Sequence, residues 1–121
     1  MLPSEPASAR LGRAATAALL TSLGAPAPLV DAAVLVASEL VTNAVRHADG
    51  GDVLLLVEAD STSVSVGVGD SAPQHPELVA AYEGGGRGML VVSALAERWH
   101  VEEVDGGKVV WAHLRAPGDG A

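Results

Sequence analysis

The sequence predicts an α+β protein that folds as a two-layer α/β sandwich, with helices packed on one face of a mixed, mainly antiparallel sheet. Two observations carry this expectation. Apolar residues recur with helical spacing in two N-terminal segments, and they alternate with polar residues over 62–69. The predicted order is two helices, two strands, a loop, one helix and two strands, and such grouped elements form two layers. We expect one domain over 1–116 and a flexible tail over 117–121.

The first two helices follow from this spacing and from the residues at their ends. An Ala-rich helix is predicted over 7–23, and Gly24 and Pro26 end it, by a C-cap and by a missing N–H donor. The second helix is predicted over 28–48. We expect Asp31 in its first turn, where a carboxylate favours the helix dipole.

The rest of the chain reads as strands and turns around one more helix. Prolines and glycines make 71–85 a loop with one helical turn around 77–82, and a third helix is predicted over 87–97. Turns are expected at 60–61 and, as a tight hairpin, at 105–107. The strands are predicted at 52–59, 62–69, 98–104 and 108–115.

Composition excludes several classes of function. The net charge of −8 argues against direct binding to nucleic acid or to an anionic membrane, since both need a basic surface. The chain has no cysteine, so disulfides and thiol chemistry are excluded, and its four histidines lack the close spacing of a zinc site. We expect neither a secretory leader nor a membrane span, because the first ten residues lack the pattern of a leader and no run approaches the ~18 apolar residues of a span. A soluble, cytoplasmic protein is therefore expected.

The stretch SELVTNAVRHA places polar side chains along one stripe of the second helix. Residues four apart are neighbours on a helix, so Glu39, Asn43 and His47 lie together with Arg46 beside them. A solvent-facing stripe on an amphipathic helix is the commoner interpretation when the stripe is taken alone. The functional alternative rests on chemistry, because an amide oxygen and a carboxylate suit Mg²⁺ and a general base.

Two further stretches are weak signals by themselves. Asp70 stands at the end of the alternating strand, where it could accept a hydrogen bond from a ligand amino group or simply begin a turn before Pro73. The stretch EGGGRGMLVVSAL puts glycines before a helix, an arrangement that binds phosphate or merely gives a flexible entry to the helix. It is neither a Walker A motif nor a dinucleotide fingerprint.

Taken together and in this order, the stretches resemble the GHKL (Bergerat-fold) superfamily of histidine-kinase-like ATPase domains. SELVTNAVRHA resembles the N box of that superfamily, and VGVGDSAP resembles its adenine-binding strand. GGGRGML resembles the glycine-rich lid end, and 108–114 the closing strand. The resemblance runs from Ala9 to Arg115. Within the superfamily, D-S-x-P and GGRGMLVV followed by ALAERW are typical of bacterial regulators similar to anti-sigma-factor kinases.

The resemblance implies ATP and Mg²⁺ as cofactors and gives each site residue a role. Asn43 would hold Mg²⁺, Glu39 would be the catalytic base, and Asp70 would accept from the adenine amino group. Arg46 and His47 would line the same face, with His47 at the phosphate or supporting Asn43. The remaining ATP-binding positions would be Ala72, Gly84, Gly85, Gly86, Arg87, Gly88, Met89 and Lys108.

Two of these positions depart from the pattern of the superfamily. Ala72 stands where Asp-x-Gly has its glycine, so a methyl group meets the adenine. Lys108 follows Gly107 where the closing strand usually has threonine, which helps to hold adenine through water.

The resemblance implies an anti-sigma-factor-like serine/threonine kinase. Its expected partners are an anti-anti-sigma (STAS-type) protein, which it would phosphorylate, and a sigma factor, which it would sequester; a homodimer is a further expectation. The alternative from a different class is a non-catalytic nucleotide-binding module that acts by holding a partner. An ATP-independent structural domain is a third interpretation.

Overall fold

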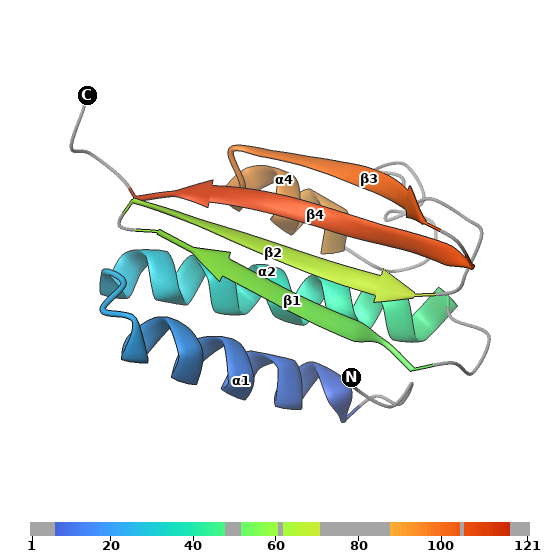
Figure 1. The fold of residues 1–121 in the computed structure, drawn as a ribbon, viewed down its shortest axis with the longest axis horizontal. Helices are drawn as coiled ribbons and strands as arrows, with labels where there is room; N and C mark the ends of the chain where they lie inside the picture. Colours follow the sequence, from blue (N-terminus) through green and yellow to red (C-terminus); the bar gives the residue numbers. More distant parts are fainter. Residues whose placement is uncertain (1–6, 48–51, 61, 71–87, 105, 117–121) are drawn as a thin grey trace.

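The computed structural model describes residues 7–47, 52–60, 62–70, 88–104 and 106–116 (Figure 1). Each element lies within two residues of its prediction. The helices of these ranges are α1 (Ser8–Ser22), α2 (Ala27–His47) and α4 (Gly88–Leu95). The strands are β1 (Leu54–Ala59), β2 (Ser63–Asp70), β3 (Arg98–Val104) and β4 (Gly107–Arg115). The proposed tail at 117–121 and the helical turn at 77–82 lie outside the described residues.

The strands form one sheet in the order β1-β2-β4-β3, with β2 and β4 at its centre. Every pairing among the described strands is antiparallel, so the expectation of a mixed sheet was wrong for this part of the chain. In the register of the two central strands, Val66 faces Ala112 and Asp70 faces Lys108. Because side chains alternate along a strand, Asp70 and Lys108 lie on the same sheet face as the buried valines of β2.

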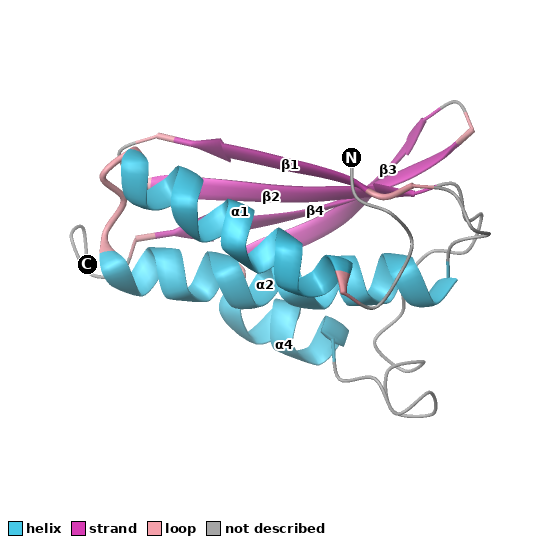
Figure 2. Cartoon of the chain, turned by 90° about the horizontal axis from the view of Figure 1, so that it is seen from below, coloured by secondary structure: helices cyan, strands magenta, loops and turns pink. Residues whose placement is uncertain are grey.

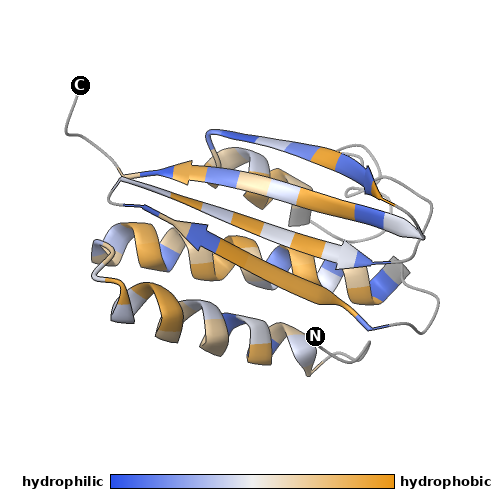
Figure 3. Cartoon of the chain, in the orientation of Figure 1, coloured by the Kyte–Doolittle hydropathy of each residue, from blue (hydrophilic) through white to orange (hydrophobic). Residues whose placement is uncertain are grey.

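The helices cover one face of this sheet, which confirms the predicted two-layer α+β sandwich (Figure 2). α2 is the central helix, since it contacts α1, α4 and both central strands. Its Val36, Ala37 and Val41 are fully buried against valines of β2. Figure 3 shows apolar residues along most of β1, whereas β3 is largely polar.

α1 approaches α2 through small side chains. The buried positions of α1 are four residues apart, so they form one stripe of Ser8, Gly12, Thr16 and Leu20. A hydrogen bond also links the two helices, because Arg13 Nη1 donates to the buried Ser38 Oγ at 2.8 Å. Ser38, the first residue of the SELVTNAVRHA stretch, is therefore a structural contact with α1.

Two expectations about α2 were wrong. The helix begins at Ala27 and has no acidic residue in its first turn, so Asp31 lies beyond the position that favours the dipole. Ala27–Arg46 is also long and apolar enough to cross a membrane, with a mean hydropathy of 1.4, although no such segment was expected. A core helix passes the same test, and 44% of the apolar window is buried within the fold.

Turns at both ends of the sheet use residues suited to them. Asp60 Oδ1 accepts from the backbone N–H groups of Thr62 and Ser63 at 2.8 and 2.9 Å, which confirms the predicted Asp turn between β1 and β2. Gly106, between β3 and β4, has a φ of 82°, which a residue with a Cβ rarely adopts.

α4 ends earlier than predicted because the Glu97 N–H donates to the His113 carbonyl in β4.

Candidate functional site

One end of the molecule brings together the segments that the sequence marked for function. In Figure 1, the C-terminal ends of α2 and β2, the beginning of β4 and the N-terminal end of α4 all lie toward the right. This follows from chain direction, since α2 and β2 run the same way while β4 runs antiparallel to β2. The candidate site is therefore an end of the sandwich, next to the central helix.

The polar stripe of α2 lies at the edge of the core. Glu39 and Asn43 are partly buried and Arg46 is exposed, while Leu40 and Ala44 on the same helix are core residues. His47 is the last residue of α2, and its side chain lies outside the described part of the structure. The stripe is thus not a fully solvated face, which weakens the commoner interpretation of it.

Glu39 and Asn43 have the chemistry of a magnesium site. Within the described ranges, neither side chain has a hydrogen bond or an ion pair. They present a carboxylate and an amide oxygen one turn apart, and hard oxygen donors of this kind suit Mg²⁺. Asn43 therefore fits the metal, and Glu39 the general base, that the sequence resemblance implies.

The N-terminal end of α4 supplies backbone donors. α4 begins at Gly88, and the first N–H groups of a helix have no partner within it. Met89, in the first turn, has its side chain in the core at 3% exposure, so only its backbone remains for a ligand. This fits the predicted role of the Met89 amide, because unpaired N–H groups at a helix start favour phosphate.

Asp70 and Lys108 form a buried ion pair that was not predicted from the sequence. Lys108 Nζ lies 2.7 Å from Asp70 Oδ1, and the two side chains are 4% and 3% exposed. The departure at Lys108 thus places a cation directly on the carboxylate expected to bind adenine. The alternation of side chains along β2 and β4 could have predicted this pair. It places the last residue of β2 and the second residue of β4 on the core face of the sheet.

Several predicted site residues cannot be placed. Ala72, the glycine run 84–86 and Arg87 lie outside the described residues. Their proposed roles at the adenine ring and the phosphates stay predictions. Among the predicted positions, the structure brings together those on α2, the end of β2, the start of β4 and the start of α4.

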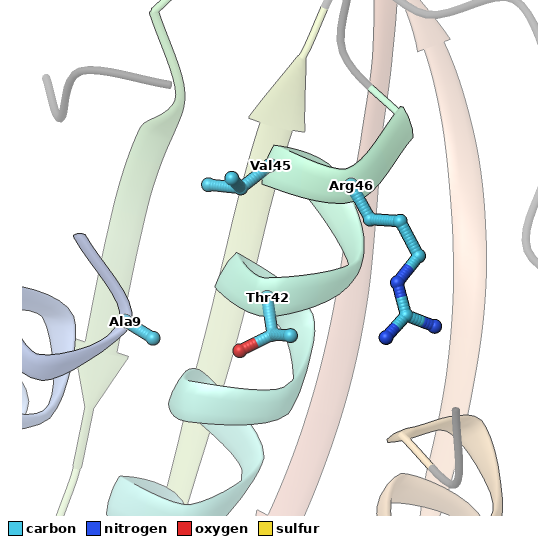
Figure 4. A pocket seen from close by; sticks show the side chains of 4 residues that line it. All are labelled: Ala9, Thr42, Val45 and Arg46. Carbon is cyan, nitrogen blue, oxygen red and sulfur yellow. The ribbon is translucent and has the colours of Figure 1, made fainter. Parts of the chain in front are cut away.

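A cavity of about 310 Å³ lies beside α2 and shares Arg46 with the predicted site (Figure 4). It is lined by Ala9 from α1 and by Thr42, Val45 and Arg46 from α2. The Arg46 side chain extends away from Ala9 and Val45 in Figure 4. Glu39 and Asn43 are not among the described residues that line it, so among these residues the cavity shares only Arg46 with the nucleotide site inferred from the sequence.

The structure also brings together two histidines that are distant from this site. On the sheet face away from the helices, the rings of His100 and His113 stack with centroids 5.0 Å apart, and Ser65 Oγ lies 2.8 Å from His113 Nδ1. Burial lowers the pKa of His113, and the nearby charges of Arg98 and His100 lower it further. The part of the chain that the structure describes contains no cluster of three or more metal-ligating side chains.

Comparison with known proteins supports this view of the fold. The family model of the histidine kinase-like ATPase domain matches residues 2–114. Solved structures that match include the histidine kinase AdeS of Acinetobacter baumannii, with a TM-score of 0.55 and 16% sequence identity. That match covers 74% of this chain and 48% of the AdeS chain, so the protein spans about half of that structure. No curated protein matches the sequence.

The family match covers nearly the whole chain, including the stripe on α2, the end of β2 and the start of α4. The fold that it implies is the one observed, a helical layer on an antiparallel sheet. This chain belongs to the histidine kinase-like ATPase domain family.

Proposed function

We propose that this chain is an ATP-binding regulator that works like the anti-sigma-factor serine/threonine kinases. It transfers the γ-phosphoryl group of ATP to a serine or threonine of a STAS-type anti-anti-sigma protein in the cytoplasm, and it otherwise sequesters a sigma factor. The observation that carries the proposal is the pair of Glu39 and Asn43. They are partly buried, without side-chain partners in the described ranges, on the helix that contacts α4 and the central strands.

In this proposal each residue of the site has the role that the sequence resemblance implies. Mg²⁺–ATP supplies the phosphoryl group and neutralises its developing charge when bound. The Asn43 amide oxygen holds the metal, and the backbone at the start of α4 binds phosphate oxygens. Glu39 would accept the proton of the partner's hydroxyl group as that oxygen bonds to the γ-phosphorus and the bond from phosphorus to the bridging oxygen breaks, releasing ADP. Asp70 accepts a hydrogen bond from the adenine amino group.

Two features support the proposal of a kinase: the presence of both a candidate base and a candidate metal ligand, and the sequence resemblance. A domain that only held a partner protein would need neither a general base nor a metal ligand, yet Glu39 and Asn43 are both present. The run GGRGMLVV followed by ALAERW resembles the short anti-sigma-factor-like regulators.

One observation favours a second function, a nucleotide-binding module without catalysis. The carboxylate assigned to adenine is already paired with Lys108 in a dry environment. A site whose base contact is occupied in this way binds nucleotide more weakly, and the protein would then act by binding its partner. The two functions share the ATP site and differ in whether Glu39 is needed.

Phosphotransfer from γ-labelled ATP to the STAS-type proteins of the source genome tests the choice between them. We expect Glu39→Ala to lower the transfer rate by about 10²–10⁴-fold, because a positioned general base contributes that much. ATP affinity should stay within about threefold of wild type, since Glu39 contacts the proton and not the nucleotide base.

Two controls make the assay decisive. Asn43→Ala should lose both transfer and magnesium-dependent binding, whereas Thr42→Ala, on the cavity side of the same helix, should lose neither. Transfer by Glu39→Ala at the wild-type rate would exclude Glu39 as the base. A wild-type protein that binds ATP and its STAS-type partner without any transfer would establish the non-catalytic module instead.

A further inference from the structure

We propose that the contact between His100 and His113 is a pH-sensitive switch that holds the edge strand β3 to the sheet. The contact is intact while at most one of the two imidazoles is charged. It breaks when acid charges both rings, and β3 then opens. The inference is independent of the proposed function, because it uses no residue of the candidate nucleotide site.

His113 is connected to three other parts of the fold. Its Nδ1 lies 2.8 Å from Ser65 Oγ on β2, and its Nε2 lies 3.3 Å from His100 Nδ1 on β3. Its backbone carbonyl accepts a hydrogen bond from the N–H of Glu97 at 2.7 Å. His113 therefore connects β4 to β2, to β3 and to the segment between α4 and β3.

β3 is the strand that this contact can release. It lies at an edge of the sheet, and among the described strands it pairs with β4 alone (Figure 1). Five of its seven residues are exposed, whereas most of β2 is buried. Local opening needs the least free energy where little apolar surface is buried, so β3 opens more easily than the central strands.

The contact tolerates one added proton but not two. A hydrogen bond between two imidazole nitrogens needs a proton on one nitrogen and a lone pair on the other. A first added proton leaves this bond intact, because one ring is still neutral and can accept. A second added proton puts N–H groups on both nitrogens, which are 3.3 Å apart, and like charges on stacked rings whose centroids are 5.0 Å apart.

The charged groups around the two rings are Glu58 on β1, Glu97 before β3, Arg98 and Glu102 on β3, and Arg115 on β4. Burial, Arg98 and His100 lower the pKa of His113 below its ordinary 6.5, although the two nearby carboxylates, Glu58 and Glu97, oppose this. The unfolded chain therefore binds the second proton first, and the stability of the folded state falls as pH drops below 6.5.

A titration followed by nuclear magnetic resonance of the ring protons tests the coupling. In wild type we expect two apparent pKa values at least about 1 apart, because one charged ring disfavours a charge on the other. His100→Gln keeps an amide that can donate to His113 Nε2 but does not titrate. In this variant the pKa of His113 should rise towards 6.5, since the charge of His100 is gone.

Amide hydrogen exchange tests whether β3 opens. The measured quantity is the exchange rate of β3 divided by that of β2 in the same protein, because the chemical step changes with pH equally in both. From pH 7.5 to pH 5 this ratio should rise about fivefold or more in wild type and stay constant in His100→Gln. Asp60→Asn is the control, because Asp60 titrates below pH 3.8, and it should behave as wild type.

Three results would overturn the inference. The first is independent titration of the two rings in wild type. The second is a wild-type exchange ratio that does not change between pH 7.5 and pH 5, because charging both rings would then leave β3 closed. The third is a rise of this ratio in His100→Gln that equals the rise in wild type. The first two need no variant, so the test does not depend on the folding of His100→Gln.

Discussion

Gly67 lies beneath the indole of Trp111, on the sheet face away from the helices, and the two residues face each other in the β2–β4 register. A Cβ at this position would come within 2.8 Å of the indole ring carbons, so the ring must move. We expect Gly67→Ala to lower the free energy of unfolding by about 1–3 kcal/mol, the usual cost of overpacking. Urea unfolding followed by tryptophan fluorescence measures this.

Gly69 on the same strand is the matched control. A Cβ there would lie 3.4 Å from Val109 Cγ2 and 3.5 Å from Leu54 Cβ, which are ordinary contact distances. Gly69→Ala should therefore change stability by less than about 1 kcal/mol, since alanine also restricts the unfolded chain. Equal losses in the two variants would show that the indole does not limit space above Gly67.

The turn at Asp60 should make stability depend on acidic pH. Backbone N–H groups of Thr62 and Ser63 hold the pKa of Asp60 below its usual 3.8. The unfolded chain therefore takes up this proton first as pH falls, and the stabilisation present above pH 3.8 is lost below it. We expect the stability difference between wild type and Asp60→Asn to shrink from pH 5 to pH 2.5.

Asp60→Asn suits this test because its amide oxygen can still accept the two backbone bonds but does not titrate. The measurement is the urea midpoint of both proteins across the pH range. A difference that stays constant with pH would mean that the charge of Asp60 does not strengthen the turn.

At the scale of elements, the α1–α2 contact contains a polar atom that the packing leaves unsatisfied. Thr16 is fully buried, and its Oγ1 has no hydrogen-bond partner among the described residues. Thr16→Val keeps the shape and removes the hydroxyl, so the free energy of unfolding should rise by about 1 kcal/mol. Thr16→Ser keeps the hydroxyl and removes the methyl group, so stability should fall by about 1 kcal/mol.

Thermal unfolding of the two Thr16 variants measures both effects. A loss of stability in Thr16→Val as large as that in Thr16→Ser would contradict the account, because it would mean that the hydroxyl makes a bond in the folded protein.

Elements were predictable where one periodicity dominates. Val64, Val66 and Val68 alternate strictly, and all three are buried on the helix side, so β2 could be placed from sequence alone. The ends depended on partners elsewhere in the chain. α4 stops at Leu95 because Glu97 bonds to β4, and no local pattern encodes that contact.

For the whole molecule, the candidate site was predictable where a motif lies on one element. The spacing of Glu39 and Asn43 within α2 placed them on one face before the fold was known. Asp70 and Lys108 are 38 residues apart in the sequence and lie on different strands. Predicting their ion pair therefore required the register of β2 and β4. Sequence reasoning identified both residues but assigned them separate roles.

Calorimetric titration of the protein with ATP, with and without Mg²⁺ and beside Asn43→Ala, decides whether α2 carries the nucleotide site. If the stripe on α2 is the nucleotide site, wild type binds ATP more tightly with Mg²⁺, and this dependence disappears in Asn43→Ala but not in Thr42→Ala. The absence of heat and of a thermal shift at millimolar ATP, or magnesium dependence that persists in Asn43→Ala, would contradict the account.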